Sequence, residues 1–78
     1  GEDNMDIELF RTSSEEERKK LRKILLNKQI SFSERWEKIP LVKRGKYGGQ
    51  KEMCVVYISE FYDSQVDEIC KLMETENV

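Results

Sequence analysis

The glycine-rich, basic segment of residues 43–51 has the residue types best suited to binding a ligand. Its glycines, at positions 45, 48 and 49, alternate with basic and aromatic side chains, namely Lys43, Arg44, Lys46, Tyr47 and Lys51. Glycines let backbone N–H groups approach a phosphate closely, while lysine and arginine supply positive charge. The P-loop pattern G-x-x-x-x-G-K-[ST] is absent, and no helix is predicted directly after the segment. Two interpretations stay open: an anion site formed by these five side chains, or a solvated hairpin tip.

Three aromatic residues, Trp36, Tyr47 and Tyr57, could form a stacking platform for nucleic-acid bases beside this basic segment. The RNA-binding signature K/R-G-F/Y-G/A-F-V-x-F/Y is absent, however, and the isoelectric point is near 5.2. Both observations argue against a dedicated nucleic-acid binder. The alternative is that these rings fill the core.

No group of side chains in the sequence indicates catalysis. The chain has no histidine, which removes the commonest general base at neutral pH and the commonest zinc ligand. Cys54, Ser59, Glu60 and Asp63 have reactive groups, but no spacing links a nucleophile to a base and an orienting residue. We therefore predict a non-enzymatic protein without catalytic residues, cofactor or bound metal.

The cysteine usage favours an intracellular protein. Cys54 and Cys70 each lie among apolar neighbours, unlike the dense cysteine pattern of a disulfide-stapled secreted domain. Two buried thiols are the simpler interpretation, and a redox-responsive pair is the alternative if the two elements that carry them pack together. No apolar run approaches the ~20 residues of a membrane helix, and no signal-peptide pattern is present. These features predict a soluble, cytoplasmic protein that does not interact with membranes.

Charge is unevenly distributed along the 78 residues, although the net charge is only -2. Residues 1–10 carry four acids and no base, residues 11–51 carry thirteen bases and five acids, and residues 52–78 carry seven acids and one base. A basic middle could present a positive face to an anionic partner or be neutralised by folding. The length predicts a single domain over residues 5–75, with 1–4 disordered or an expression remnant and 76–78 a frayed tail.

Apolar periodicity predicts a strand, then a helix, in the first third of the chain. Alternation over residues 5–10 has the period of two that is typical of a half-buried strand. Ser13/Glu16 and Ser14/Glu17 both have capping-box spacing, and the apolar residues that follow recur at helical intervals. The helix is expected to fray over residues 27–29.

The second half of the chain predicts a hairpin and another helix. Ile30, Phe32 and Trp36 are at even-numbered positions and would lie on the same face of a strand. Pro40 cannot donate a hydrogen bond to a neighbouring strand, so this strand is expected at the edge of the sheet, with pairing resuming at residues 41–42. A tight turn at Gly48-Gly49 would place Val42 opposite Val55 and Lys46 opposite Lys51. The apolar run 53–58 predicts a central strand. Asp63 or Ser64 then caps a helix whose inward stripe is Val66, Ile69, Cys70 and Met73.

These elements together predict a two-layer α+β fold in the order β-α-β-β-α. A right-handed crossover leaves room for strand 53–58 between the other two strands, which gives a split βαβ arrangement. The result is ferredoxin-like without a clear fourth strand: a three-stranded antiparallel sheet with both helices on one face. The other face and the edge of the first strand would remain open.

The same elements resemble a known family. The order of elements resembles that of the prokaryotic signal-transducing family of small ferredoxin-like domains. The elements that carry the resemblance are the strand 7–10, the helix after Ser13 that ends in Leu25-Leu26, the turn into 30–32, a glycine-containing hairpin, and the strand Val55-Val56-Tyr57 before a C-terminal helix. That family is distantly similar to nitrogen-regulatory PII proteins. The resemblance covers residues 5–75 through element order and apolar spacing, and this chain departs from it in its longer, more basic hairpin. It implies a small regulatory or ligand-sensing module, with no functional residue to carry over.

The functional prediction is a non-enzymatic regulatory, sensing or protein-interaction domain. Its open sheet face or first-strand edge would form a homodimer or bind a protein partner. The alternative is binding of an anion or nucleic acid by the basic hairpin 43–51, with a small anionic ligand favoured over nucleic acid.

Overall fold

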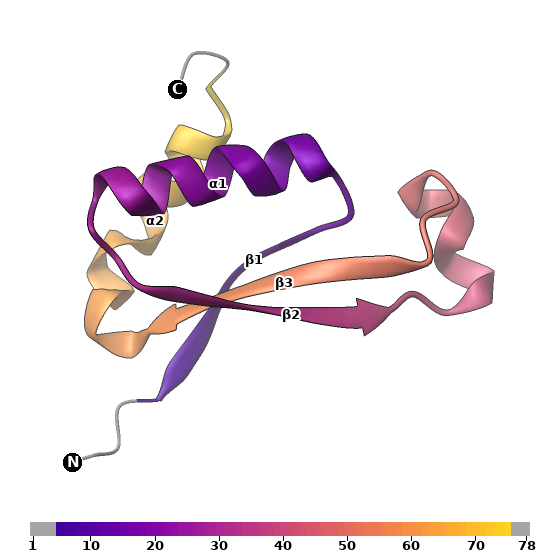
Figure 1. Cartoon of the computed structure of the whole chain (residues 1–78), viewed down its shortest axis with the longest axis horizontal. Coiled ribbons are helices and arrows are strands. Elements are labelled where there is room, and N and C mark those ends of the chain that lie inside the picture. Colours follow the sequence, from indigo (N-terminus) through magenta and orange to yellow (C-terminus); the bar gives the residue numbers. More distant parts are fainter. Residues whose placement is uncertain (1–4, 76–78) are drawn as a thin grey trace.

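The computed structural model describes residues 5–75, which form a three-stranded antiparallel sheet with two helices on one face (Figure 1). The elements in chain order are β1 (Asp6–Thr12), α1 (Glu15–Asn27), β2 (Phe32–Lys38), the 3-10 helix η1 (Leu41–Tyr47), β3 (Glu52–Ser59), the 3-10 helix η2 (Glu60–Gln65) and α2 (Val66–Met73). The strand order β1-β3-β2 confirms the predicted α+β class with the last strand central. The predictions for residues 1–4 and 76–78 lie outside the described residues.

β3 is covered on both of its faces. Cys54, Val56 and Ile58 point into the core beneath the helices, together with Leu21, Leu25 and Ile69. The alternate residues Met53 and Val55 point to the other face and are buried as well. A run of apolar, largely β-branched residues suits this position because it has no polar side. The sequence-based prediction of a doubly covered strand is confirmed.

α1 begins and ends with identifiable caps. Ser14 is the N-cap, and its Oγ accepts a hydrogen bond of 3.3 Å from the backbone N–H of Glu17. Of the two predicted capping boxes, Ser13/Glu16 is not used, and Ser14/Glu17 forms only in part. The Ser14 N–H donates to Thr12 Oγ1 instead of to Glu17, and the Glu17 carboxylate accepts from that same Thr12 hydroxyl. After the last turn Gln29 adopts a positive φ of 58°, and the N–H of Ile30 donates to the Leu25 carbonyl. This reversal brings Ile30 into the core and leads into β2.

The sheet face opposite the helices is closed by charged side chains. Arg11 and Arg35 both pair with Val55 from the flanking strands. The Arg11 guanidinium binds Glu8 at 2.7 Å and Glu37 at 3.5 Å, while Arg35 lies over the Tyr57 ring at 5.5 Å. Exposed ion pairs of this kind contribute little to stability because solvent screens them, but the long aliphatic stems exclude water from Val55. The face predicted to be open is therefore polar and internally ion-paired.

The connection between β2 and β3 differs from the predicted hairpin. Residues 41–47 form η1, so Leu41 and Val42 do not resume the strand, and Val55 faces Arg35 instead of Val42. The last strand contact before the loop is the Ile39 N–H donating to the Lys51 carbonyl at 2.8 Å. Gly48 and Gly49 do have the expected positive φ, but Gly48 caps η1 and Lys46 is not paired with Lys51. Pro40 supplies the fixed φ at the N-cap of η1, which favours leaving the strand there.

Two further details correct the sequence-based prediction. In β1 the register shifts between Glu8 and Phe10, so Leu9 is a bulged residue and simple alternation does not extend through the strand. At the C-terminal end, helical structure begins with η2, whose N-cap Ser59 accepts a hydrogen bond from the Phe61 N–H. α2 follows directly without a side-chain cap from Asp63 or Ser64.

The adjacent leucines of α1 provide a matched test of this core. Leu25 is completely buried, whereas Leu26 is 64% exposed. We expect Leu25→Ala to lower the free energy of unfolding by about 2–5 kcal/mol, because it leaves a cavity beneath the sheet. Leu26→Ala should change it by less than about 0.5 kcal/mol. Urea titration followed by circular dichroism measures both, and equal losses would contradict this packing.

Candidate functional site

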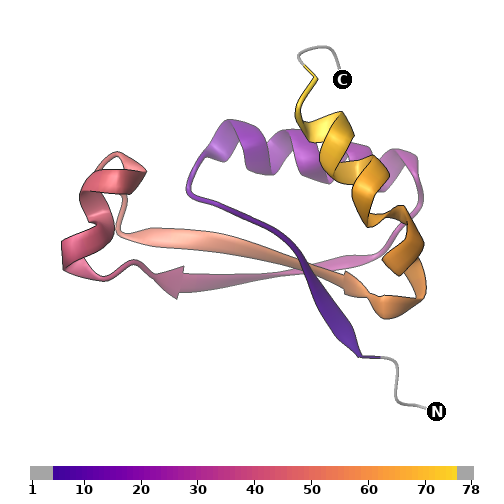
Figure 2. The same ribbon diagram turned by 180° about the vertical axis from the view of Figure 1, so that it is seen from behind.

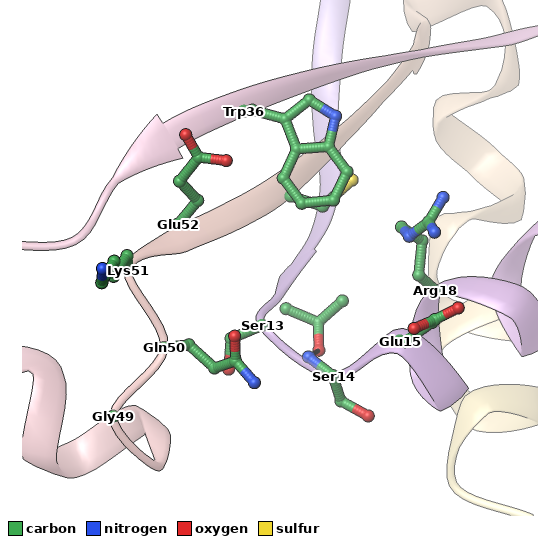
Figure 3. Close-up of a pocket in the computed structure, with 11 residues that line it drawn as sticks. Ser13, Ser14, Glu15, Arg18, Trp36, Gly49, Gln50, Lys51 and Glu52 are labelled. Carbon is green, nitrogen blue, oxygen red and sulfur yellow. Dashed lines mark hydrogen bonds between the residues drawn. The ribbon is translucent and has the colours of Figure 1, made fainter.

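A cleft of about 570 Å³ lies beside the first turn of α1, at the end of the sheet that extends beyond this helix (Figure 3). Its lining comes from the β1–α1 junction, the start of α1, the middle of β2 and the residues entering β3. The lining residues are Thr12, Ser13, Ser14, Glu15, Arg18, Trp36, Gly49, Gln50, Lys51, Glu52 and Cys54. We call this the Trp36 cleft. Its volume is within the range of small-molecule sites, roughly 300–1,000 Å³.

Trp36 is the large apolar surface of this cleft. It pairs with Cys54 in the sheet, which places it on the helix-covered face, yet its side chain is 55% exposed. The Arg18 guanidinium lies 5.4 Å from the centre of the indole ring. Arg18 is itself held by Glu34 at 3.7 Å, and Glu34 also binds Arg22 at 3.2 Å. The indole is therefore positioned by a charged network without being buried by it.

The polar rim of the cleft contains both engaged and free groups. Thr12 Oγ1 accepts a hydrogen bond of 2.9 Å from the Ser14 N–H and donates to the Glu17 carboxylate. Within residues 5–75, the side chains of Ser13 and Gln50 make no hydrogen bond. Figure 3 shows Gln50 extending toward Ser13 and Ser14 across the cleft. An amide and a hydroxyl are thus available to a bound molecule.

The charges around the cleft are mixed. Arg18 and Lys51 contribute positive charge, and Glu15 and Glu52 contribute negative charge. Glu15 forms an ion pair with Lys19 at 3.4 Å on the outer face of α1. With both signs present, the cleft has no electrostatic preference for a simple anion. Shape and hydrogen bonding must select its ligand.

The five residues predicted to form an anion site are distributed over different surroundings. Lys51 lines the Trp36 cleft, whereas Lys43 and Tyr47 line a separate hollow of about 120 Å³ on the other side of the sheet. The Nε of Arg44 donates to the Ile39 carbonyl at 3.1 Å and so stabilises η1. Lys46 is exposed and lines neither hollow. The structure therefore does not gather these side chains around one point.

The backbone of this segment is also unsuited to holding a phosphate. The N–H of Gly49 donates to the Arg44 carbonyl at 2.7 Å, and that of Gln50 donates to the Tyr47 carbonyl at 3.2 Å. The donors that a glycine-rich phosphate loop would direct at its ligand are thus used within the loop. The predicted aromatic platform is likewise divided, because Trp36 and Tyr57 project from opposite faces of the sheet.

The Trp36 cleft was missed in the sequence, although signals for it are present. Paired serines ahead of a helix are read first as caps, and Ser14 does serve as one. In the alternation of β2, Trp36 is at a position whose side chain faces the core, so burial is expected there. Trp36 is exposed because α1 begins at a point that leaves this end of the sheet uncovered. The position of a helix over a sheet cannot be derived from the apolar periodicity of the sequence.

Both cysteines are free thiols on separate elements, Cys54 buried in β3 and Cys70 partly buried in α2. Desolvation by burial is the main cause that raises the pKa of each thiol, and nearby carboxylates, Glu34 for Cys54 and Asp67 for Cys70, raise it further. The stability that these thiols contribute is complete below the thiol pKa of the unfolded chain. It is lost as the pH rises through the raised pKa of the folded state. Residues 5–75 contain no cluster of acidic or cysteine side chains able to hold a metal ion.

Comparison of the chain with family models, with curated proteins and with solved structures finds no match. Within residues 5–75, neither α1 nor α2 combines the length and the apolar character that crossing a bilayer requires.

The raised pKa and burial of Cys54 lead to a reactivity prediction. In a Cys70→Ser variant at pH 8, we expect Ellman's reagent to modify Cys54 on the order of 100-fold more slowly than in urea, because reaction requires both opening and deprotonation. The rate should increase as the pH is raised. Rapid modification of the folded protein at neutral pH would contradict the placement of Cys54 on the core side of β3.

Proposed function

We propose that this chain is a non-enzymatic binding domain that takes a small molecule with a planar, hydrogen-bonding ring into the Trp36 cleft. The observation that carries the proposal is the half-exposed indole of Trp36 in a cleft that also contains unengaged polar side chains. Large aromatic side chains are normally buried when they point to a core, so this exposed ring is a ready surface for a second ring.

Stacking on Trp36 would supply much of the binding energy. A flat ring on an aromatic side chain contributes about 1–3 kcal/mol in base–protein complexes. The indole needs little reorganisation because Arg18 and Glu34 already restrain it, with the Arg18 guanidinium 5.4 Å from the ring centre. A preorganised surface loses less free energy on binding than a mobile one.

The polar edge of the ring would be recognised from the opposite side of the cleft. Gln50 offers both an amide donor and an acceptor, and Ser13 offers a hydroxyl that can do either. Glu52 accepts hydrogen bonds from an amino group, and Lys51 can meet a carboxylate or phosphate substituent. Nucleosides and aromatic amino acids share this chemistry of a flat ring with donors and acceptors at its edge.

The state of the reactive groups in the cleft supports a binding role in this proposal. Its thiol, Cys54, has a raised pKa and is held as the weakly nucleophilic neutral form. Its two acids, Glu15 and Glu52, are both exposed, and Glu15 is paired with Lys19. Binding without turnover agrees with a sensing role, which is also what the resemblance in element order implies.

Intrinsic fluorescence tests the proposal directly, because Trp36 is the only tryptophan in the chain. We expect a nucleoside or an aromatic amino acid to quench or shift Trp36 emission in a saturable way. Gln50→Ala should weaken the affinity by about fivefold to tenfold through the loss of one hydrogen bond. Titration of adenosine, guanosine, cytidine, uridine, phenylalanine and tyrosine would contradict the proposal if none gave saturation.

Matched controls separate this site from the basic hairpin. Lys46→Ala removes a cation that lines neither hollow and should leave the titration unchanged. Comparing each nucleoside with its monophosphate measures what the phosphate adds. If inorganic phosphate alone bound, and Lys46→Ala abolished that binding, the hairpin and not the Trp36 cleft would be the ligand site.

A further inference from the structure

The connection between β2 and β3 forms a projecting basic arm, which we define as residues 38–51. It contains five cations and no acid, namely Lys38, Lys43, Arg44, Lys46 and Lys51. Two neighbouring aliphatic side chains stand on it almost fully in solvent, Leu41 at 75% exposure and Val42 at 90%. Scattered exposed apolar residues are ordinary, but an adjacent pair surrounded by charge of one sign is a contact surface.

The 3-10 geometry of η1 determines which side chains share a direction. Residues three apart are nearly eclipsed in such a helix, so Val42 shares an edge with Gly45, and Lys43 shares the next edge with Lys46. The third edge consists of Leu41, Arg44 and Tyr47, of which Arg44 and Tyr47 are partly buried and Leu41, at the start of η1, is exposed. The exposed surface of the arm therefore combines Val42 and the two lysines of the next edge with Leu41 at the start of the helix.

The other end of the molecule carries the complementary combination, which we call the Phe61 patch: Met5, Glu60, Phe61 and Asp63. Phe61 is 77% exposed and is fixed edge-on against Tyr62, with ring centroids 5.1 Å apart. Met5 is exposed and is joined to this patch by a 2.9 Å backbone hydrogen bond from the Glu60 N–H to the Met5 carbonyl. Within residues 5–75, Glu60 and Asp63 form no ion pair, so their negative charge is available.

The two surfaces lie at opposite ends of the long axis, as Figures 1 and 2 show from both sides. The molecule extends 39 Å in its longest dimension, so the arm cannot reach the Phe61 patch of its own chain. The patch has the opposite charge to the arm and presents a ring for Leu41 and Val42 to pack against. A net charge of only -2 gives little overall repulsion between copies.

We propose that this protein associates with itself head to tail, with the basic arm of one copy contacting the Phe61 patch of the next. The contact joins two different surfaces, so it generates open chains or closed rings. The surfaces are small, which places the contact among weak, concentration-dependent ones. A second copy accounts for the exposed residues at both ends, whereas an anionic lipid surface would account for the arm alone.

Mixing two complementary variants tests this arrangement. Val42→Asp disables the arm, and Phe61→Lys disables the patch; both positions are exposed, so folding should be unaffected. In sedimentation from about 10 μM to about 1 mM, wild type should show growing assemblies while each variant alone stays monomeric. The equimolar mixture should form a 1:1 complex and stop there, because one working arm and one working patch remain. Raising salt from about 0.05 M to about 0.5 M should weaken it about tenfold or more.

Leu26→Ser is the matched control, because Leu26 is an exposed leucine of α1 outside both surfaces, and it should assemble like wild type. A strictly monomeric wild type, or a mixture that forms no complex, would overturn the proposal. So would wild type that stays monomeric but binds anionic lipid vesicles in a manner lost in Val42→Asp, since that assigns the arm to a membrane. Ligand titration at Trp36 should be unaffected by Val42→Asp, which keeps this test independent of the proposed function.

Discussion

Double burial of β3 is the constraint on which the rest of the fold depends. A strand with no polar side needs a cover on each face, and in a chain this short the two covers differ. The helices α1 and α2 provide an apolar cover for Cys54, Val56 and Ile58. On the reverse face the stems of Arg11 and Arg35 shield Val55, with carboxylates holding the guanidinium of Arg11. The same layout leaves one end of the sheet beyond α1, and the Trp36 cleft lies in that uncovered region.

Much of the architecture could be predicted because local signals and global packing agree. The apolar run of β3, the Ser14 cap and the helical spacing of Leu21, Ile24 and Leu25 each indicate the same element that packing requires. The β2–β3 connection could not be predicted in this way. Its Gly-Gly pair suits a tight turn, but Pro40 interrupts the ladder earlier and directs the chain into η1.

The candidate site was less accessible from sequence than the fold. Its members come from three separate segments, so no spacing unites them, and the residue that matters most, Trp36, occupies a position that is normally in the core. The basic hairpin residues gave the stronger signal in the sequence, yet folding disperses them and engages Arg44 with the Ile39 carbonyl. Positive charge close together along a chain need not converge on one point in space. The open sheet face, proposed from topology alone, proves to carry side chains that satisfy one another.

The pairing of β1 with β3 has a consequence for how the chain reaches this structure. Asp6 is opposite Ser59 and Thr12 is opposite Cys54, so the first strand to be synthesised finds its partner only after more than half of the chain has followed. β2 and β3 are much closer in sequence and can form their ladder without it. In the folded sheet β1 is an edge strand, and the bulge at Leu9 makes its free edge irregular. Once β1 has paired, such an edge is a poor template for pairing with another chain.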